Sequence, residues 1–167
     1  EPGGNNNSEK IRKIILSKKS KFNKITDLLL YLAARSENVE QLKKYYRKKI
    51  ILIDRFVDST IAYQHYGFGV DIKLIKFINN FILKNFKVDY TFLHIVNRKN
   101  MINRLKSRKS LNRYDKFNQM FYENVQKGFL KIAKKNIKKY KIINSNLDIK
   151  YNQNEIIQII DRLLWVI

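Results

Sequence analysis

The feature that most constrains the fold is a short apolar run, Ile50–Ile53, that ends in the charged pair Asp54 and Arg55. Four consecutive apolar residues, three of them β-branched, predict a buried strand. In open α/β sheets, ligands bind at the carboxyl ends of the strands, where this run would deliver a carboxylate and a guanidinium. The polar segment that follows predicts a helix. We therefore expect a ligand site built on residues 50–69.

The other apolar runs alternate between strand-like and helix-like patterns, which predicts a parallel sheet flanked by helices and an α/β fold. Nothing marks a domain boundary, so we expect one domain over residues 1–167. Only three strands are visible, which is few for such a sheet. The predicted strands are 49–53, 90–96 and 141–144, and the predicted helices are 9–19, 26–46, 58–66, 71–85, 100–106, 116–139 and 154–167.

Helix caps and helix faces can also be predicted. Ser8 suits the N-cap of the first helix, and Thr26 or Asp27 suits that of the second. The spacing of apolar residues in the last helix predicts its inward face. That face is expected to consist of Ile156, Ile157, Ile160, Leu163 and Leu164.

The formal net charge is +21, and 26 of the 35 basic residues are lysines. The lysines are scattered, and Lys, Ile and Asn together make up 69 of the 167 residues, which A/T-rich codons would supply. We therefore favour biased base composition over a dedicated nucleic-acid surface. The absence of cysteine excludes disulfides and thiolate metal sites and is compatible with a reducing compartment. No apolar run has the length of a membrane span, and we expect a cytoplasmic protein.

Five motifs occur in an order and spacing that resembles bacterial thymidylate kinases over essentially the whole chain. The resemblance implies a P-loop nucleoside monophosphate kinase fold, ATP-dependent phosphorylation of dTMP to dTDP, Mg²⁺, and a homodimer. The motifs are E-P-G-G at 1–4, S-E-K-I-R at 8–12, Y-L-A-A-R at 31–35, D-R-F-x-D-S-T-x-A-Y-Q at 54–64 and N-R-Y-D at 112–115.

For the acceptor phosphate, the resemblance implies four residues. Asp54 matches the strand-end carboxylate that organises Mg²⁺ and its waters, and Arg55 matches an arginine that contacts the dTMP phosphate. Arg12 matches a second phosphate-binding arginine, and Glu1 a carboxylate near the sugar 3′-hydroxyl. Arginine suits phosphate because its planar fork binds in a bidentate manner.

For the nucleoside, the resemblance implies a stacking ring at Tyr31, four residues before Arg35, which would contact a carbonyl of the base. Residues four apart in sequence lie on the same face of a helix. Thr60 and Gln64 match positions that hydrogen-bond the base, and Tyr63 matches a tyrosine that lies against the deoxyribose 2′ position. On composition alone, a core aromatic would be the simpler interpretation of Tyr31.

The stretch 107–115 is basic and has no apolar periodicity, and it resembles the family's lid. The resemblance implies that Arg104, Arg108 and Arg113 close over the ATP phosphates. We assign Arg108 and Arg113, with Asp54 and Arg55, to the catalytic set. A solvated charged loop is the alternative.

The family's phosphate-binding motif G-x-x-x-x-G-K-[ST] is absent. None of the five glycines is followed five residues later by another, because those positions hold Ser8, Glu9, Ile72, Leu74 and Ala133. We therefore expect an N-terminally truncated kinase that lacks the first strand, the P-loop and the first helix, a unit of roughly 35 residues. As written, the chain should be inactive. Smaller departures include Phe68 in place of an arginine, and Tyr31 where phenylalanine is common.

Two other functions remain open. A non-catalytic remnant would still bind dTMP saturably without hydrolysing ATP. A basic nucleic-acid-binding domain would bind duplex DNA with an affinity that falls steeply with salt.

Overall fold

The structure, a computed structural model, describes residues 1–108 and 110–165. It divides into two compact units. The first consists of Glu1–Val88 and Leu111–Ile132, and the second of Asp89–Ser110 and Ala133–Ile167. Within the described ranges, no helix combines the length and the apolar character needed to cross a membrane.

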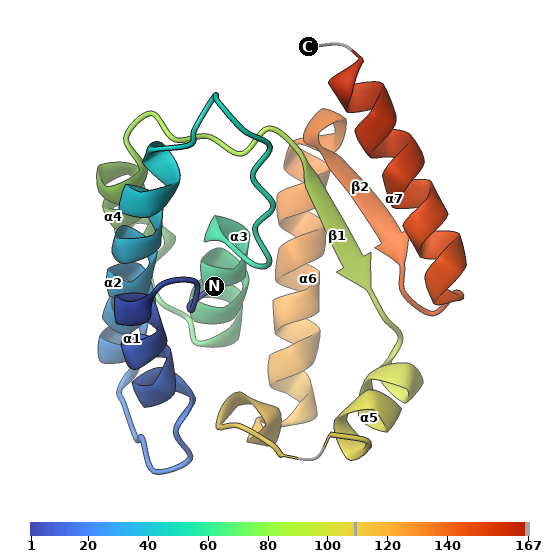
Figure 1. Cartoon of the computed structure of the whole chain (residues 1–167). Coiled ribbons are helices and arrows are strands. Elements are labelled where there is room, and N and C mark those ends of the chain that lie inside the picture. Colours follow the sequence, from blue (N-terminus) through green and yellow to red (C-terminus); the bar gives the residue numbers. More distant parts are fainter. Residues whose placement is uncertain (109, 166–167) are drawn as a thin grey trace. The chain divides into compact units, whose positions relative to one another are not determined.

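The first unit is helical, and α1 and α2 lie side by side in it (Figure 1). One part of its core joins α2 to α4 through Leu28, Leu32, Val70 and Ile75. A second part packs α6 against the segment after α3. The helices are α1 (Asn6–Leu16), α2 (Lys24–Lys43), α3 (Val57–Thr60), the π-helix η1 (Ile61–Gly67), α4 (Ile72–Leu83), the 3₁₀ helix η2 (Tyr114–Lys116) and the first part of α6 (Gln119–Lys135).

Asparagines, rather than the predicted residues, cap the first two helices. The side chain of Asn5 accepts hydrogen bonds at the start of α1, and Ser8 lies in the first turn and completes a capping box. The side chain of Asn23 caps α2. The predicted caps Ser8, Thr26 and Asp27 were therefore wrong, because each lies inside its helix, one turn after an asparagine that reaches the free N–H groups first.

The second unit contains a parallel pair of strands, β1 (Thr91–Ile95) and β2 (Tyr140–Asn144), in register from Thr91 opposite Tyr140 to Ile95 opposite Asn144. This confirms that the second and third predicted strands belong to a parallel sheet. Two contacts join α7 to β2: Lys141 pairs with Glu155 at 2.7 Å, and Asn152 donates to the carbonyl of Asn144 at 3.1 Å. The helices are α5 (Arg98–Lys106), the 3₁₀ helix η3 (Ile137–Lys139) and α7 (Ile149–Leu164).

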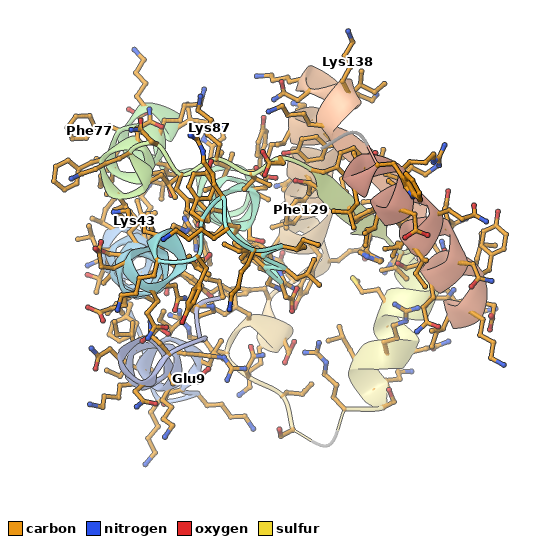
Figure 2. The ribbon with its side chains drawn as sticks, turned by 45° about the horizontal axis from the view of Figure 1, so that its top comes forward. Glu9, Lys43, Phe77, Lys87, Phe129 and Lys138 are labelled. Carbon is orange, nitrogen blue, oxygen red and sulfur yellow. The ribbon has the colours of Figure 1, made fainter. Side chains whose placement is uncertain are left out.

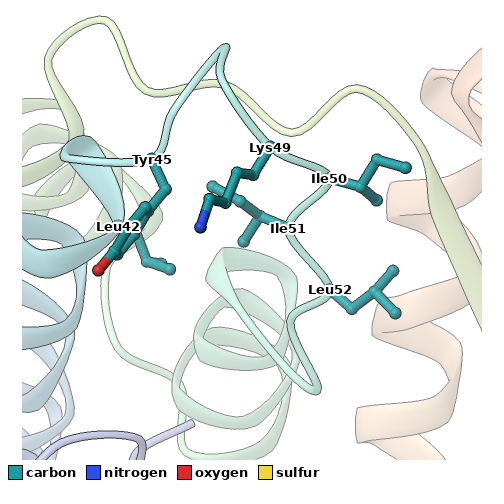
Figure 3. A pocket seen from close by; sticks show the side chains of 6 residues that line it. All are labelled: Leu42, Tyr45, Lys49, Ile50, Ile51 and Leu52. Atoms are coloured by element: carbon teal, nitrogen blue, oxygen red, sulfur yellow. The ribbon is translucent and has the colours of Figure 1, made fainter.

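The predicted strand Lys49–Ile53 is not a strand in the structure. Its side chains alternate as in a strand: Ile50 and Leu52 point to one side, and Lys49 and Ile51 to the other (Figure 3). The described sheet has only two strands, β1 and β2, so no ladder of hydrogen bonds includes this segment. As a result Ile50 is 67% exposed and Leu52 84% exposed, instead of buried.

The predicted inward face of the last helix was right only in part: Ile156, Ile160 and Leu163 are half-buried, whereas Ile157 and Leu164 are exposed. The helix begins at Ile149, capped by Asp148, and not near Asn154. Its buried residues are Asn152 and Ile159, while Ile157 is 54% exposed. Isoleucines occur on more than one face of this helix, so periodicity alone did not exclude Ile157 from the inward face.

Candidate functional site

A cavity of about 270 Å³ opens in the first unit, between the E-P-G-G segment and the chain around Asp54. The backbone nitrogen of Glu1 donates to the carbonyl oxygen of Asp54 at 2.6 Å. Two residues predicted from different motifs therefore lie together. The cavity is lined by Glu1, Gly3, Gly4, Asn38, Gln41, Leu42, Leu52, Ile53, Asp54 and Phe56.

A buried ion pair joins Glu1 to α2. Arg35 donates from Nε and Nη2 to the carboxylate of Glu1 at 3.0–3.2 Å, and the two side chains are 2% and 5% exposed. Its Nη1 donates to Asn79 at 2.7 Å, and its guanidinium lies over the ring of Phe56 at 5.2 Å. Such a buried pair is tolerated because the charge is both paired and hydrogen-bonded.

The amide of Asn38 positions the E-P-G-G segment. Its Nδ2 donates to the carbonyl of Gly3 at 2.9 Å, and its Oδ1 accepts from Asn5 at 2.9 Å. A Cβ at Gly3 would lie 1.9 Å from Oε1 of Glu9, so a side chain there would require the half-exposed carboxylate of Glu9 to move. Arg12 reaches the same place, where it pairs with Glu9 at 3.3 Å and stays about half exposed. Sequence reasoning missed Asn38, although it follows Arg35 by one turn.

Arg55 lies next to Tyr63, as two of the predicted site residues should. Its guanidinium stands over the Tyr63 ring at 5.6 Å, and Nη1 lies 3.5 Å from the phenol oxygen. The backbone of Arg55 has φ +61°, in the left-handed region that bulky side chains avoid. Residues held in this region cluster at functional sites.

The two predicted base-binding residues are both buried. Thr60 is 2% exposed and Gln64 is 1% exposed, so a ligand reaches them only if neighbouring groups move. Within the residues that the structure describes, Oγ1 of Thr60 has no hydrogen-bond partner. Because buried hydroxyl groups nearly always form a hydrogen bond, the unpaired Oγ1 of Thr60 is available to a ligand. Gln64 and Tyr63 lie on the π-helix η1, a type of turn that recurs at functional sites.

Asp27 forms a cluster that sequence reasoning missed. Its carboxylate, in the first turns of α2, accepts hydrogen bonds from Arg113 and from the phenol of Tyr114. Tyr31 lies edge-on to Tyr114, with ring centroids 6.0 Å apart. Burial raises the pKa of Tyr31 to about 12 and raises the pKa of Tyr114, so both phenols keep their protons at neutral pH. The available signal was a single carboxylate placed directly before three leucines.

Phe68, which replaces an arginine of the family pattern, belongs to an aromatic cluster. Its ring lies 5.2 Å from Phe117, 4.8 Å from Phe121 and 6.3 Å from Tyr114. Phe68 therefore contributes packing to the core between η1 and α6.

The three arginines of the predicted lid do not lie together in one unit. Arg104 and Arg108 belong to the second unit, where Arg104 donates to the carbonyl of Ser145 at 2.6 Å. Arg113 belongs to the first unit and is paired with Asp27. Their predicted contact with ATP stays a prediction.

The predicted metal ligand, Asp54, is an exposed carboxylate at the end of the extended segment. Across residues 1–108 and 110–165, no three His, Cys, Asp or Glu side chains group into a metal site. Mg²⁺ fits one carboxylate nonetheless, because it keeps several waters and takes other ligands from substrate phosphates.

Comparison with known proteins gives a consistent result. The family model for thymidylate kinase matches residues 1–156. A thymidylate kinase from Wolbachia pipientis wMel is 36% identical over 165 residues, covering 98% of this chain and 81% of the relative. One from Mycoplasma capricolum subsp. capricolum is 36% identical over 165 residues, covering 96% and 78%. The crystal structure of thymidylate kinase from Ehrlichia chaffeensis superposes with a TM-score of 0.74 at 30% identity, covering 96% of this chain and 78% of that one.

Proposed function

Because the chain belongs to the thymidylate kinase family, we propose that it binds dTMP and presents its phosphate to the γ-phosphate of ATP. An oxygen of the dTMP phosphate forms a bond to the γ-phosphorus, the bond to the ADP oxygen breaks, and dTDP and ADP result. The observation that supports this most is the cavity shared by Glu1 and Asp54, with the buried Arg35 behind it.

In this proposal the protein mainly positions charge, since phosphoryl transfer needs little covalent chemistry from the enzyme. Arg55 and Arg12 bind the acceptor phosphate, and Glu1 lies near the 3′-hydroxyl. Asp54 holds Mg²⁺ through water, and the metal when bound neutralises charge on the transferring phosphate.

The nucleoside occupies the wall formed by α2 and η1. Tyr31 supplies the stacking ring, and Tyr63 covers the sugar face from beneath Arg55. Thr60 and Gln64 bind the base, which would give the unpaired hydroxyl of Thr60 its partner. Arg35 contacts a base carbonyl once ligand binding loosens its pair with Glu1.

The donor nucleotide needs more than these residues. Arg104, Arg108 and Arg113 are proposed to close over the ATP phosphates. The 167 residues contain no G-x-x-x-x-G-K-[ST] motif, so they supply no backbone cradle for those phosphates. We propose that turnover requires a strand–P-loop–helix segment added to this sequence, and that without it the chain binds dTMP but does not form dTDP.

We further propose that the chain works in the cytoplasm as one kinase domain. We also propose that it pairs with a second copy of itself through α4. Leu74, Phe77 and Phe81 lie three and four residues apart along α4 and are 37%, 72% and 73% exposed. Figure 2 shows Phe77 projecting away from the helices of the first unit. Light scattering should report a dimer that Phe77→Glu with Phe81→Glu converts to a monomer.

The test of the proposed function compares the 167-residue chain with a version extended by a P-loop segment. The short chain should bind dTMP in calorimetry and form no dTDP, whereas the extended chain should form dTDP. In the extended chain, Asp54→Asn and Arg55→Ala should each lower kcat about 100-fold or more, because each removes charge stabilisation of the transferring phosphate.

Three results would count against the proposal. Wild-type turnover in both variants would refute the assigned roles. Formation of dTDP by the short chain would refute the need for the added segment. Absence of dTMP binding by the short chain would refute the proposed binding of dTMP. It would also remove support from the alternative of a non-catalytic remnant that binds dTMP.

A further inference from the structure

The carboxylate of Asp27 connects three separate segments of the first unit. It lies on α2 and accepts from Arg113 and Tyr114, near the end of the basic loop 107–115, and from Nε2 of Gln64 on η1 at 3.4 Å. We propose that Asp27 is a positioning residue: it anchors the end of the basic loop to the nucleoside-binding wall and sets the orientation of Gln64. The anchoring stands on geometry alone, and its consequence for dTMP rests on the proposed function.

The anchor is electrostatic and buried. The side chain of Asp27 is 3% exposed, and that of Arg113 is 14% exposed. Arg113 and Tyr114 bind different oxygens of the carboxylate, and they contact each other at 3.2 Å. Neutralising the carboxylate would leave the guanidinium of Arg113 without its counter-charge in a poorly solvated place, which is costly. The segment 113–114 should then detach from α2.

The same carboxylate determines which end of the Gln64 amide faces inward. An ionised carboxylate only accepts hydrogen bonds, so the NH₂ group of Gln64 must face Asp27. The amide oxygen is then the group left for a ligand. A pyrimidine base with a ring N–H, such as thymine, can donate to that oxygen, whereas cytosine offers a ring acceptor at the same position. Asp27 would therefore favour dTMP over dCMP through Gln64.

Trypsin provides a readout of the anchor that needs no activity. It cuts after Arg113 only when that side chain enters the protease, and so only when it has left Asp27. In the full chain, Asp27→Asn should speed cleavage of the Arg113–Tyr114 bond about tenfold or more. The matched control is Glu40→Gln, on the same helix, whose side chain is 75% exposed and pairs with Lys43 at 3.1 Å. The control should leave the cleavage rate unchanged.

A second variant guards against misfolding of the first. Tyr114→Phe removes one bond to Asp27 and keeps the ion pair with Arg113, so it should speed the same cleavage by a smaller factor. Circular dichroism of each variant checks the fold. Calorimetry with dTMP and dCMP then measures the preference between the two, which Asp27→Asn should reduce and Glu40→Gln should not.

The outcomes separate the two claims. Faster cleavage after Arg113 with a reduced preference for dTMP supports both. Unchanged cleavage in both Asp27→Asn and Tyr114→Phe overturns the anchor. If Asp27→Asn is cleaved faster than wild type but the wild-type protein binds no dTMP, the anchor is supported and the proposed function is overturned. Faster cleavage with an unchanged dTMP preference supports the anchor and overturns the role assigned to Gln64.

Discussion

Arg35 is the largest fully buried side chain that the structure describes. Its charge is matched by Glu1 on one side, and its Nη1 donates to Asn79 on the other. The orientation of Asn79 is fixed in turn, because its Nδ2 donates to the carbonyl of Ile75 at 2.8 Å. A neutral amide on α4 therefore helps to hold a cation on α2 in place.

Asn79→Ala should destabilise the fold by about 2 kcal/mol, because it leaves a buried guanidinium N–H without an acceptor. Asn80→Ala is the control, since Asn80 is the exposed neighbour on the same helix. Urea unfolding followed by circular dichroism measures both. If Asn79→Ala lowers the free energy of unfolding no more than Asn80→Ala does, the hydrogen bond to Arg35 contributes little to stability.

Tyr31 should make stability depend on pH above the neutral range. Burial raises its pKa from 10.0 to about 12, so the folded state keeps the phenol proton over an interval in which the unfolded state releases it. The contribution of the Tyr31 proton to the free energy of unfolding is fully present below pH 10 and is lost as the pH rises to 12. Two pKa units correspond to at most about 2–3 kcal/mol.

Tyr31→Phe has no phenol to ionise and should lose less stability than the wild type between pH 9 and pH 12. Lysine deprotonation affects both proteins alike and cancels in the difference. Tyr151→Phe serves as the control, because Tyr151 is 59% exposed. Parallel stability–pH curves for wild type and Tyr31→Phe would contradict the assigned pKa shift.

Among the helices, α6 and η1 approach closely at Gly128. A Cβ at Gly128 would lie 2.5 Å from Cδ2 and 2.9 Å from Cβ of Tyr66, too near the root of that side chain for it to rotate away. Alanine would gain about 1 kcal/mol in helix propensity. Overpacking costs about 1–3 kcal/mol, so we expect Gly128→Ala to destabilise the protein on balance.

Thermal unfolding provides the measurement for this substitution. Lys127→Ala, at an exposed position of the same helix, should change stability by less than about 0.5 kcal/mol. A Gly128→Ala variant more stable than wild type would mean that α6 and η1 can separate without cost, and that the packing around Tyr66 is loose.

Most helices and the strands β1 and β2 could be predicted from local sequence pattern, because the periodicity of apolar residues is set within a few residues. The segment at Ile50–Leu52 could not, since a strand requires a partner that pattern alone does not supply. At the site, Glu1, Asp54, Arg55 and Tyr63 were predicted and do lie in adjacent pairs. Asp27 was not, because its partners are 37 to 87 residues away in sequence.

For the whole molecule, the net charge of +21 raises the alternative of a nucleic-acid-binding domain. If the lysines are scattered by composition, duplex DNA should bind weakly and without sequence preference, and added salt should abolish binding near physiological ionic strength. Fluorescence anisotropy at 50 and 200 mM KCl tests this. Submicromolar binding that survives 200 mM salt would favour the nucleic-acid alternative.

The two compact units should differ in stability. The paired strands bury Leu93 and Ile143, and a two-stranded sheet is marginal without broad packing. In the first unit, α2 buries Leu28, Leu32 and Val39 almost completely. Amides of Thr91–Ile95 should therefore exchange hydrogen at least about 100-fold faster than those of Leu28–Val39, a difference of about 2.7 kcal/mol.

Hydrogen exchange followed by mass spectrometry at neutral pH resolves peptides from both units in one experiment. Equal protection of the two sets of amides would show that the units unfold together and would contradict the prediction. Faster exchange in β1 would mean that Arg104 and Arg108 belong to the less stable unit, while Arg113 is held in the more stable one by Asp27. If the three arginines close over ATP as proposed, the closure would then require ordering on the side of Arg104 and Arg108, while Arg113 is already held by Asp27.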